Sequence, residues 1–373
     1  MAESTSPKTL QSIHFLRGLA SVMVVLIHAL GSVTLKFPGE HSALPRSFED
    51  YLYVCSASVD FFFLISGFTM FYVYAKDFGR PYAWFDFFIR RAIRIIPMYW
   101  LISALYVAIL LFAPSLFSTL KFQLVHTIES FIFIPTTNSA GENFPVVNIG
   151  WTLWYEMYFY LLFGVCMLGT VQFALWAMGI LFFLSVVAGY VIQSTSPALY
   201  VYLNQLVLEF FIGGLAGYLV LQGRRFRVPF AWALVLIGLA IFVSQFLFGE
   251  WQAGRILTRG FPALLILVGL VSLEMNSKFA CPRWAIRIGD ECYSLYLCHS
   301  LVIAVMFKAF FFLGLIRWLP ADFFVPICVG VAIFAGRHVY NWVEKPLTSA
   351  LNTAWRESKF HRQIKPSHGT LNS

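Results

Sequence analysis

Long apolar stretches recur along the whole chain of 373 residues, separated by short segments that collect Pro, Gly and charged residues. A helix needs about 20 mostly apolar residues to cross a bilayer, and ten such stretches can be placed. Their approximate centres are residues 23, 67, 104, 160, 182, 212, 239, 265, 303 and 332. Only 12% of the residues are charged, whereas a soluble domain has about 25%. The sequence therefore predicts an all-α polytopic membrane protein with about ten transmembrane helices, and it excludes a disordered, coiled-coil, secreted disulfide-rich or nucleic-acid-binding protein.

Two segments need separate interpretation. Residues 121–135 are apolar, but the stretch is short and ends at Pro135, so it predicts an interfacial or re-entrant helix; a true span here would raise the count to eleven. The first apolar run, residues 18–29, contains His28 and is followed by no small-residue cleavage pattern. It therefore predicts a retained first helix and not a cleaved signal peptide.

The basic residues predict the orientation. Lys and Arg concentrate in cytoplasmic loops when those loops are short, and a cytoplasmic N-terminus places most of the 26 basic residues on that side. With an even number of spans both termini are cytoplasmic. The formal net charge of +8 then reflects topology more than a specific anionic partner.

Common cofactor motifs are absent from the sequence. The six cysteines show no CxxC spacing, and the chain has no GxxxxGK[ST] or GxGxxG loop. We therefore expect no disulfide framework, no metal site and no nucleotide-driven pump.

Ionisable groups within the apolar stretches are the first candidates for function, because a charge in hydrocarbon costs roughly 3 kcal/mol or more. Arg17 and His28 are eleven residues apart, which places them on the same face of a helix about 16 Å apart along its axis. An Arg17 at the cytoplasmic surface would put His28 near the middle of the membrane. The alternative is that Arg17 merely extends to the interface and His28 bonds a neighbouring carbonyl.

Four further ionisable residues lie at the start of the second stretch or just before the third. Asp60 begins the second stretch and could either serve the site or lie at the external end of its helix, where the dipole favours a carboxylate. Arg90, Arg91 and Arg94 precede the third stretch; they fit positive-inside topology and equally fit a site that binds phosphate groups in bidentate fashion.

Glu156 and His299 complete the set of candidates. Glu156 lies inside the fourth stretch among Trp and Tyr residues, an environment in which a bonded carboxyl group can transfer protons; it could also be a structural Glu bonded to a Tyr. His299 lies about 12 Å into the ninth stretch when counted from Glu291, a depth similar to that of His28. Two histidines and a carboxylate could thus meet at the midplane.

This pattern favours acyl transfer. Histidine accepts a proton from a hydroxyl group, or an acyl group itself. A basic cytoplasmic mouth suits a phosphate-bearing donor, and an aromatic external mouth with Trp151 and Trp154 suits a sugar, whose C–H faces stack on aromatic rings.

The chain resembles the membrane acyltransferase family 3, which includes bacterial polysaccharide O-acetyltransferases, from about residue 12 to residue 347. The resemblance rests on six segments in series: Leu16-Arg17-Gly18 with His28; Ser58-Val59-Asp60-Phe61-Phe62 with Ser66-Gly67-Phe68; Arg90-Arg91 with Arg94 and Pro97; Trp151-Thr152-Leu153 with Glu156, Phe159 and Tyr160; Tyr293-Ser294-Leu295-Tyr296-Leu297 with His299; and Glu344-Lys345-Pro346.

The resemblance implies a role for each candidate. His28 corresponds to the catalytic histidine of the family's Arg-x10-His pair, and the arginines near Arg91 and Arg94 would hold acyl-coenzyme A on the cytoplasmic side. Glu156 matches the family's acidic position after Trp-Ser-Leu, with Thr152 in place of Ser. The expected organisation is a cytoplasmic N-terminal segment (1–11), the transmembrane acyltransferase domain (12–347) and a basic cytoplasmic tail (348–373), with no further extracytoplasmic domain.

The resulting prediction is an enzyme of the bacterial inner membrane that transfers acetyl from acetyl-coenzyme A to a sugar hydroxyl of an exopolysaccharide or its lipid-linked precursor. Its partners would be that acceptor and membrane lipid, without nucleic acid. The expected catalytic residues are His28, Glu156, Asp60 and His299, and the expected donor-binding residues are Arg17, Arg90, Arg91 and Arg94. A succinyl or other acyl donor is an alternative, as is a proton-coupled transporter or flippase that uses His and Glu as a proton relay.

Overall fold

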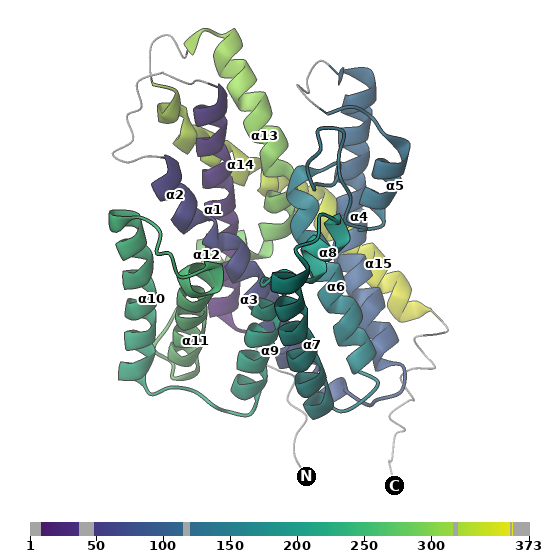
Figure 1. Cartoon of the computed structure of the whole chain (residues 1–373), viewed down its shortest axis with the longest axis vertical. Coiled ribbons are helices and arrows are strands. Elements are labelled where there is room, and N and C mark those ends of the chain that lie inside the picture. The colour runs from purple at the N-terminus through teal and green to yellow at the C-terminus, as the bar shows by residue number, and fades with distance from the viewer. Residues whose placement is uncertain (1–8, 37–47, 115–119, 316–319, 359, 361–373) are drawn as a thin grey trace.

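The computed structural model describes residues 9–36, 48–114, 120–315, 320–358 and 360, and within these ranges the protein is helical and has no strand (Figure 1). Each of the ten predicted stretches forms a helix. These helices are α1 (Gln11–Lys36), α3 (Ala57–Tyr74), α4 (Ala83–Phe112), α6 (Trp151–Cys166), α7 (Val171–Ile192), α9 (Val207–Leu221), α10 (Val228–Phe248), α11 (Phe261–Met275), α13 (Cys292–Phe312) and α14 (Val325–Val339).

Eight helices within the described ranges have the length and hydropathy of a membrane span. The two that fall short are α6, with 16 residues, and α14, with 15. A π-helical segment, Tyr340–Glu344, continues α14 directly. The eight apolar helices confirm the prediction of a multi-pass membrane protein. The count of ten transmembrane helices stays a prediction.

Shorter helices lie between the long ones: α2 (Phe48–Cys55), α5 (Leu124–Phe131), α8 (Pro197–Tyr202), α12 (Arg283–Asp290) and α15 (Lys345–Glu357). Helix α5 accounts for the ambiguous segment 121–135. Its eight residues rise only about 12 Å, too little for a core of about 30 Å. The indole of Trp100 and the hydroxyl of Tyr99 donate to carbonyl oxygens of Phe131 and Ser130, at 2.8 and 3.1 Å. The segment thus lies against α4 (Figure 1) and is not an additional span.

Loops at one end of the bundle are tied together. The amides of Gln11 and Ser12 donate to the carboxylate of Glu274, at 2.7 and 2.8 Å, which joins the start of α1 to the end of α11. The Gly79 amide donates to the Met167 carbonyl at 2.9 Å. The beginning of α1 and the loops α3–α4 and α6–α7 therefore lie at the end that the basic residues predict to be cytoplasmic. Residues 1–8 and most of the basic tail, 361–373, lie outside the described ranges.

The bundle is centred on aromatic packing between α3, α6 and α9. The ring of Phe210 stacks on those of Phe63 and Phe159, with centroids 4.4 and 4.7 Å apart. All three side chains are almost completely buried. This core holds α3 and α6 at a fixed separation, and both helices contribute to the site described below.

Glycines allow α3 and α9 to pack backbone to backbone. A Cβ on Gly213 would lie 2.0 Å from the Leu64 carbonyl oxygen, and one on Gly217 would lie 2.2 Å from that of Phe68. The same is true in the other direction, because a Cβ on Gly67 would lie 1.9 Å from the Phe210 oxygen. Gly213 and Gly217 form a GxxxG pattern, which brings helices into close contact where no hydrophobic force is available between them.

We expect Gly213→Ala to lower the free energy of unfolding by about 1–3 kcal/mol, because the added methyl group forces the two helices apart. Thermal unfolding of the purified protein in detergent measures the effect. Gly330→Ala in α14 is the matched control, since a Cβ there meets no atom within 4 Å. Equal unfolding temperatures for the two variants would contradict the proposed close packing.

Candidate active site

A cavity opens between α1, α3, α4, α6 and α13. The cavity has an empty volume of about 740 Å³, which includes the space at its opening to solvent. This volume lies within the range of about 300–1,000 Å³ that is usual for small-molecule sites. The lining residues are Arg17, Val59, Phe62, Phe63, Ile65, Ser66, Arg91, Arg94, Ile95, Thr152, Leu153, Glu156, Tyr160, Cys292, Tyr293 and Tyr296. Three of the four arginines predicted to bind the donor, together with Glu156, thus line one cavity.

Two of these arginines have N–H groups that remain available as hydrogen-bond donors. Arg17 makes no hydrogen bond or ion pair with any residue that the structure describes. Arg91 lies over the rings of Tyr74 and Tyr160, with its Cζ 5.5 and 5.6 Å from their centroids, and donates to the Tyr74 hydroxyl at 3.4 Å. Its buried Nε has no partner within the described ranges. Cation–π contacts orient the guanidinium without using its N–H groups, so both side chains can still bind an anion.

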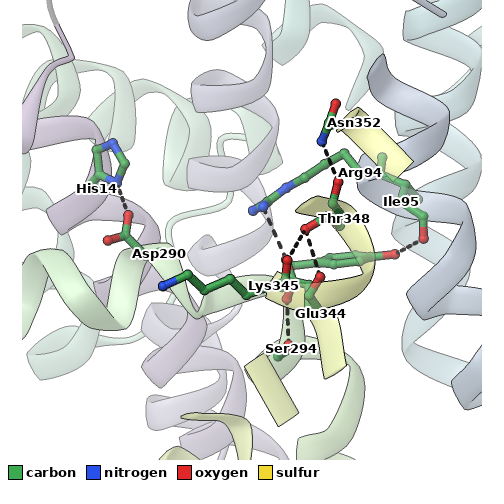
Figure 2. Close-up of polar contacts among 10 residues, drawn as sticks. His14, Arg94, Ile95, Asp290, Ser294, Glu344, Lys345, Thr348 and Asn352 are labelled. Carbon is green, nitrogen blue, oxygen red and sulfur yellow. Dashed lines mark hydrogen bonds and ion pairs between the residues drawn. The ribbon is translucent and has the colours of Figure 1, made fainter. Parts of the chain in front are cut away.

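One side of the Arg94 guanidinium forms an ion pair with a buried carboxylate. Its Nη1 lies 3.1 Å from Oε1 of Glu344, whose side chain is completely buried. The Ser294 hydroxyl donates to the other oxygen of Glu344 at 2.5 Å. Figure 2 shows this network joining α4, α13 and the helical segment that precedes α15. About a third of the Arg94 side chain remains exposed, so Arg94 both anchors the end of α14 and faces the cavity.

Arg90, the fourth predicted donor-binding residue, does not line the cavity. Its Nε donates to Asp86 at 2.7 Å, and the Trp355 indole donates to the other oxygen of Asp86 at 2.8 Å. Arg90 thus belongs to the contact between α4 and α15.

Glu156 accepts hydrogen bonds from two hydroxyl groups, and one of them belongs to a tyrosine, as the alternative interpretation of this Glu expected. Tyr160 and Ser66 both donate to its Oε1, the latter at 3.2 Å. Tyr160 also lies beneath the Arg91 guanidinium. The spacing of Glu156 and Tyr160, one helical turn apart, is the sequence signal that could have found this pair.

The two predicted histidines are neighbours. The rings of His28 and His299 have centroids 5.1 Å apart and planes inclined by 45°. His299 is fully buried, and its Nδ1 lies 2.6 Å from the Tyr296 carbonyl oxygen. Because a carbonyl oxygen only accepts, this Nδ1 carries the hydrogen and the Nε2 of the neutral ring presents a lone pair. That Nε2 has no partner among the described residues, whereas His28 is an exposed residue.

Tyr296 lies next to both the cavity and the histidine pair, and neither histidine lines the cavity. Tyr296 lines the cavity, and its ring centroid lies 6.0 Å from that of His299. Its hydroxyl donates to the Ile149 carbonyl at 2.6 Å and accepts from Thr152 at 2.7 Å. The site therefore consists of two compartments, an arginine cavity and a histidine pair, with Tyr296 adjacent to both.

Asp60 belongs to neither compartment. Its Oδ2 lies 2.6 Å from Nη2 of Arg255, and the carboxyl group of Glu209 is adjacent. Both carboxyl groups are buried. The structure thus places Asp60 in a separate cluster that joins α3 to α9 and to the segment before α11. Asp60 and Arg255 are 195 residues apart in the chain, so nothing in their spacing indicates this contact.

Comparison with known proteins agrees with this arrangement. Residues 10–336 match the model of a family described as an acyltransferase domain. The chain belongs to this acyltransferase family. It is 34% identical over 299 residues to the exopolysaccharide production protein ExoZ of Rhizobium meliloti (strain 1021), which covers 78% of this chain and 89% of that relative. No solved structure matches. The family resemblance read from the six segments is thereby confirmed.

Within the described ranges no group of three or more His, Cys, Asp or Glu side chains is placed to hold a metal ion.

We expect Arg94→Ala to destabilise the acyltransferase by about 3 kcal/mol, because it leaves the Glu344 carboxylate buried without a counter-charge. The double variant R94A/E344Q should be more stable than R94A alone, since a neutral amide can be buried and can still accept from Ser294. Unfolding temperatures in detergent test both statements. Arg90→Ala is the control, because it breaks a partly exposed pair worth below about 1 kcal/mol; a larger loss for R90A than for R94A would refute the assignment.

Proposed function

We propose that this protein is an integral membrane O-acyltransferase that moves an acetyl group from acetyl-coenzyme A to a sugar hydroxyl of an exopolysaccharide or of its lipid-linked precursor. The family and the name of the relative in Rhizobium meliloti support acyl transfer and exopolysaccharide production. The observation that carries the proposal is the contact of His28 with His299, which lies next to Tyr296 in the lining of the arginine cavity.

The arginine cavity suits the donor. Acetyl-coenzyme A carries phosphate groups, which guanidinium groups bind with charge-assisted, often bidentate hydrogen bonds. Arg17 and Arg91 retain such donors, and Arg94 faces the same space. The Phe62 and Phe63 walls offer an apolar surface to the uncharged arm that ends in the thioester. The arginines of this cavity come from the halves of α1 and α4 that the basic residues predict to be nearer the cytoplasm, where acetyl-coenzyme A is made, which fits a location in the bacterial inner membrane.

His28 is proposed as the general base. It takes the proton of the acceptor hydroxyl while the hydroxyl oxygen attacks the thioester carbonyl. The new C–O bond forms, the C–S bond breaks, and the coenzyme A thiolate leaves and takes up the proton from His28. A positioned base of this kind contributes roughly 10²- to 10⁴-fold to the rate. His299 presents the lone pair of its Nε2 toward this chemistry and is proposed to orient the His28 ring.

The two carboxylates are proposed to act through their neighbours. Glu156, bonded to Tyr160 and Ser66, fixes the aromatic surface on which the Arg91 guanidinium rests. Asp60, held by Arg255, fixes the start of α3, whose next turns supply Phe62 and Ser66 to the cavity. Both are therefore positioning residues in this proposal and do not touch the reacting atoms.

We expect His28→Ala to abolish acetyl transfer to the polysaccharide while the protein inserts at normal abundance, because the base is lost and no packing core is disturbed. Acetate released by mild alkali from surface polysaccharide measures the activity, and mass spectrometry of the modified sugar distinguishes acetyl from succinyl. His338→Ala is the control: its Nδ1 bonds the Phe334 carbonyl at 2.8 Å, the kind of local bond that His299 makes, but it lies in α14, outside both compartments. Wild-type acetate in H28A would overturn the proposal.

We also expect Arg17→Ala and Arg91→Ala to raise KM for acetyl-coenzyme A roughly tenfold or more, because each loses a charged hydrogen bond to phosphate. Initial rates with labelled acetyl-coenzyme A and deacetylated polymer give KM and kcat separately. Arg90→Ala should leave KM within a factor of two, in line with its place outside the cavity. A KM in R17A and R91A that matches the wild type would contradict donor binding in this cavity.

A further inference from the structure

A second cavity lies away from the site described above. It is formed where α7 ends, along α8 and in the turn that leads into α9, and it has an empty volume of about 650 Å³, its opening to solvent included. Gly189 forms part of its wall, and a Cβ there would lie only 2.3 Å from the Leu203 carbonyl oxygen. Gln193 ends α7 with φ +43°. The cavity is thus shaped by close backbone packing and a left-handed turn, and it lies at the end of α7 that is predicted to be external.

The lining of this cavity combines apolar side chains, those of Val186, Leu199 and Leu203, with polar ones and carries no charge. It contains the amides of Gln193, Asn204 and Gln205, the hydroxyl of Ser194, and the rings of Tyr190 and Tyr200. No Lys, Arg, Asp, Glu or His lines it. A phosphate-bearing or ionic ligand therefore finds no counter-charge here, whereas a neutral ligand rich in hydroxyl groups finds both donors and acceptors.

Two of the polar side chains are oriented by hydrogen bonds to the backbone, and they still have hydrogen-bond donors available for a ligand. The Asn204 side-chain oxygen accepts from the Leu206 amide at 3.0 Å, and the Ser194 hydroxyl oxygen accepts from the Ser196 amide at 3.1 Å. The NH₂ of Asn204 and the hydroxyl hydrogen of Ser194 remain available as donors. Gln193 and Gln205 make no side-chain hydrogen bond to any part of the chain that the structure describes.

Two tyrosines present their rings at the opening. Tyr190 is 72% and Tyr200 56% exposed, and both side chains line the cavity. Tyrosine offers an apolar face and a polar tip with little loss of conformational freedom on binding. The C–H faces of a pyranose ring pack on such a face while its hydroxyl groups reach the amides.

We propose that this cavity is a distal subsite for a neutral stretch of the carbohydrate acceptor. The inference rests on the proposed function, and it specifies the place at which the protein binds the acceptor chain. Helix α6 connects the two places: Thr152 and Glu156 line the arginine cavity, whereas the Tyr158 ring packs on Tyr202 of α8, with centroids 4.7 Å apart. A polymer bound along α8 lies on the other side of α6 from the donor, so the subsite holds sugars remote from the acetylated one.

Binding to the purified full-length protein in detergent tests the proposal without acyl transfer. The probes are oligosaccharides of one, two and at least eight sugars, prepared from the deacetylated exopolysaccharide of the host and followed by saturation-transfer difference NMR. We expect Tyr190→Ala and Tyr200→Ala to weaken binding of the longest probe about tenfold, as loss of an aromatic anchor does. Binding of acetyl-coenzyme A and the unfolding temperature should not change. Trp176→Ala is the control, because Trp176 is on α7 like Tyr190 and is 74% exposed but lies outside the cavity.

The outcomes separate this proposal from the proposed function. Loss of oligosaccharide binding in the tyrosine variants, without loss in W176A, supports the subsite even if no acetyl transfer is ever detected. Unchanged binding of the longest probe in both tyrosine variants overturns it. Displacement of the probe by phosphatidylethanolamine vesicles but by no saccharide also overturns it and assigns the cavity to a lipid headgroup.

Discussion

Inside a bilayer no water is available to solvate a charge or a polar group, so each one buried in the bundle needs a partner within the protein. Most of the buried charges of this protein meet that condition. Glu344 is bound by Arg94 and Ser294, and Asp60 is bound by Arg255. These pairs also join helices that are distant in the chain: the first fastens the end of α14 to α4, and the second fastens α3 to the segment before α11.

The groups left without partners are therefore informative. The Nε2 of His299, beside His28, is buried and lacks a partner among the described residues, and a buried imidazole lone pair is costly unless a ligand or a reaction uses it. Arg17, which is half-buried, lines the cavity and makes no ion pair with a described residue. The two groups belong to the two compartments next to Tyr296, one suited to a phosphate-bearing donor and the other to a hydroxyl acceptor.

The sequence predicted the helices well and their contacts less well. All ten apolar stretches form helices because hydrophobic runs of that length have no other way to satisfy their backbone in lipid. Helix α6, which directly follows the 3₁₀ turn Asn148–Gly150, has only 16 residues, and α14 is followed by a π-helical segment that carries Glu344. The His28 and His299 pair was anticipated from their similar depth. The position of Asp60 was not, because its partner Arg255 is 195 residues away in the chain.

Composition and periodicity by themselves determined that this protein is a multi-pass helical membrane protein, and motif order determined its family, since both are properties of local sequence. Only the tertiary structure decided which ionisable groups meet. It brought Arg17, Arg91 and Arg94 to one cavity, assigned Arg90 to a contact with α15, and placed Tyr296 next to both the cavity and His299. The physical reason is that a side chain's partner depends on how helices rotate and approach one another. That rotation is set by contacts such as the glycine face of α9 on α3, whose two sides lie far apart in the chain.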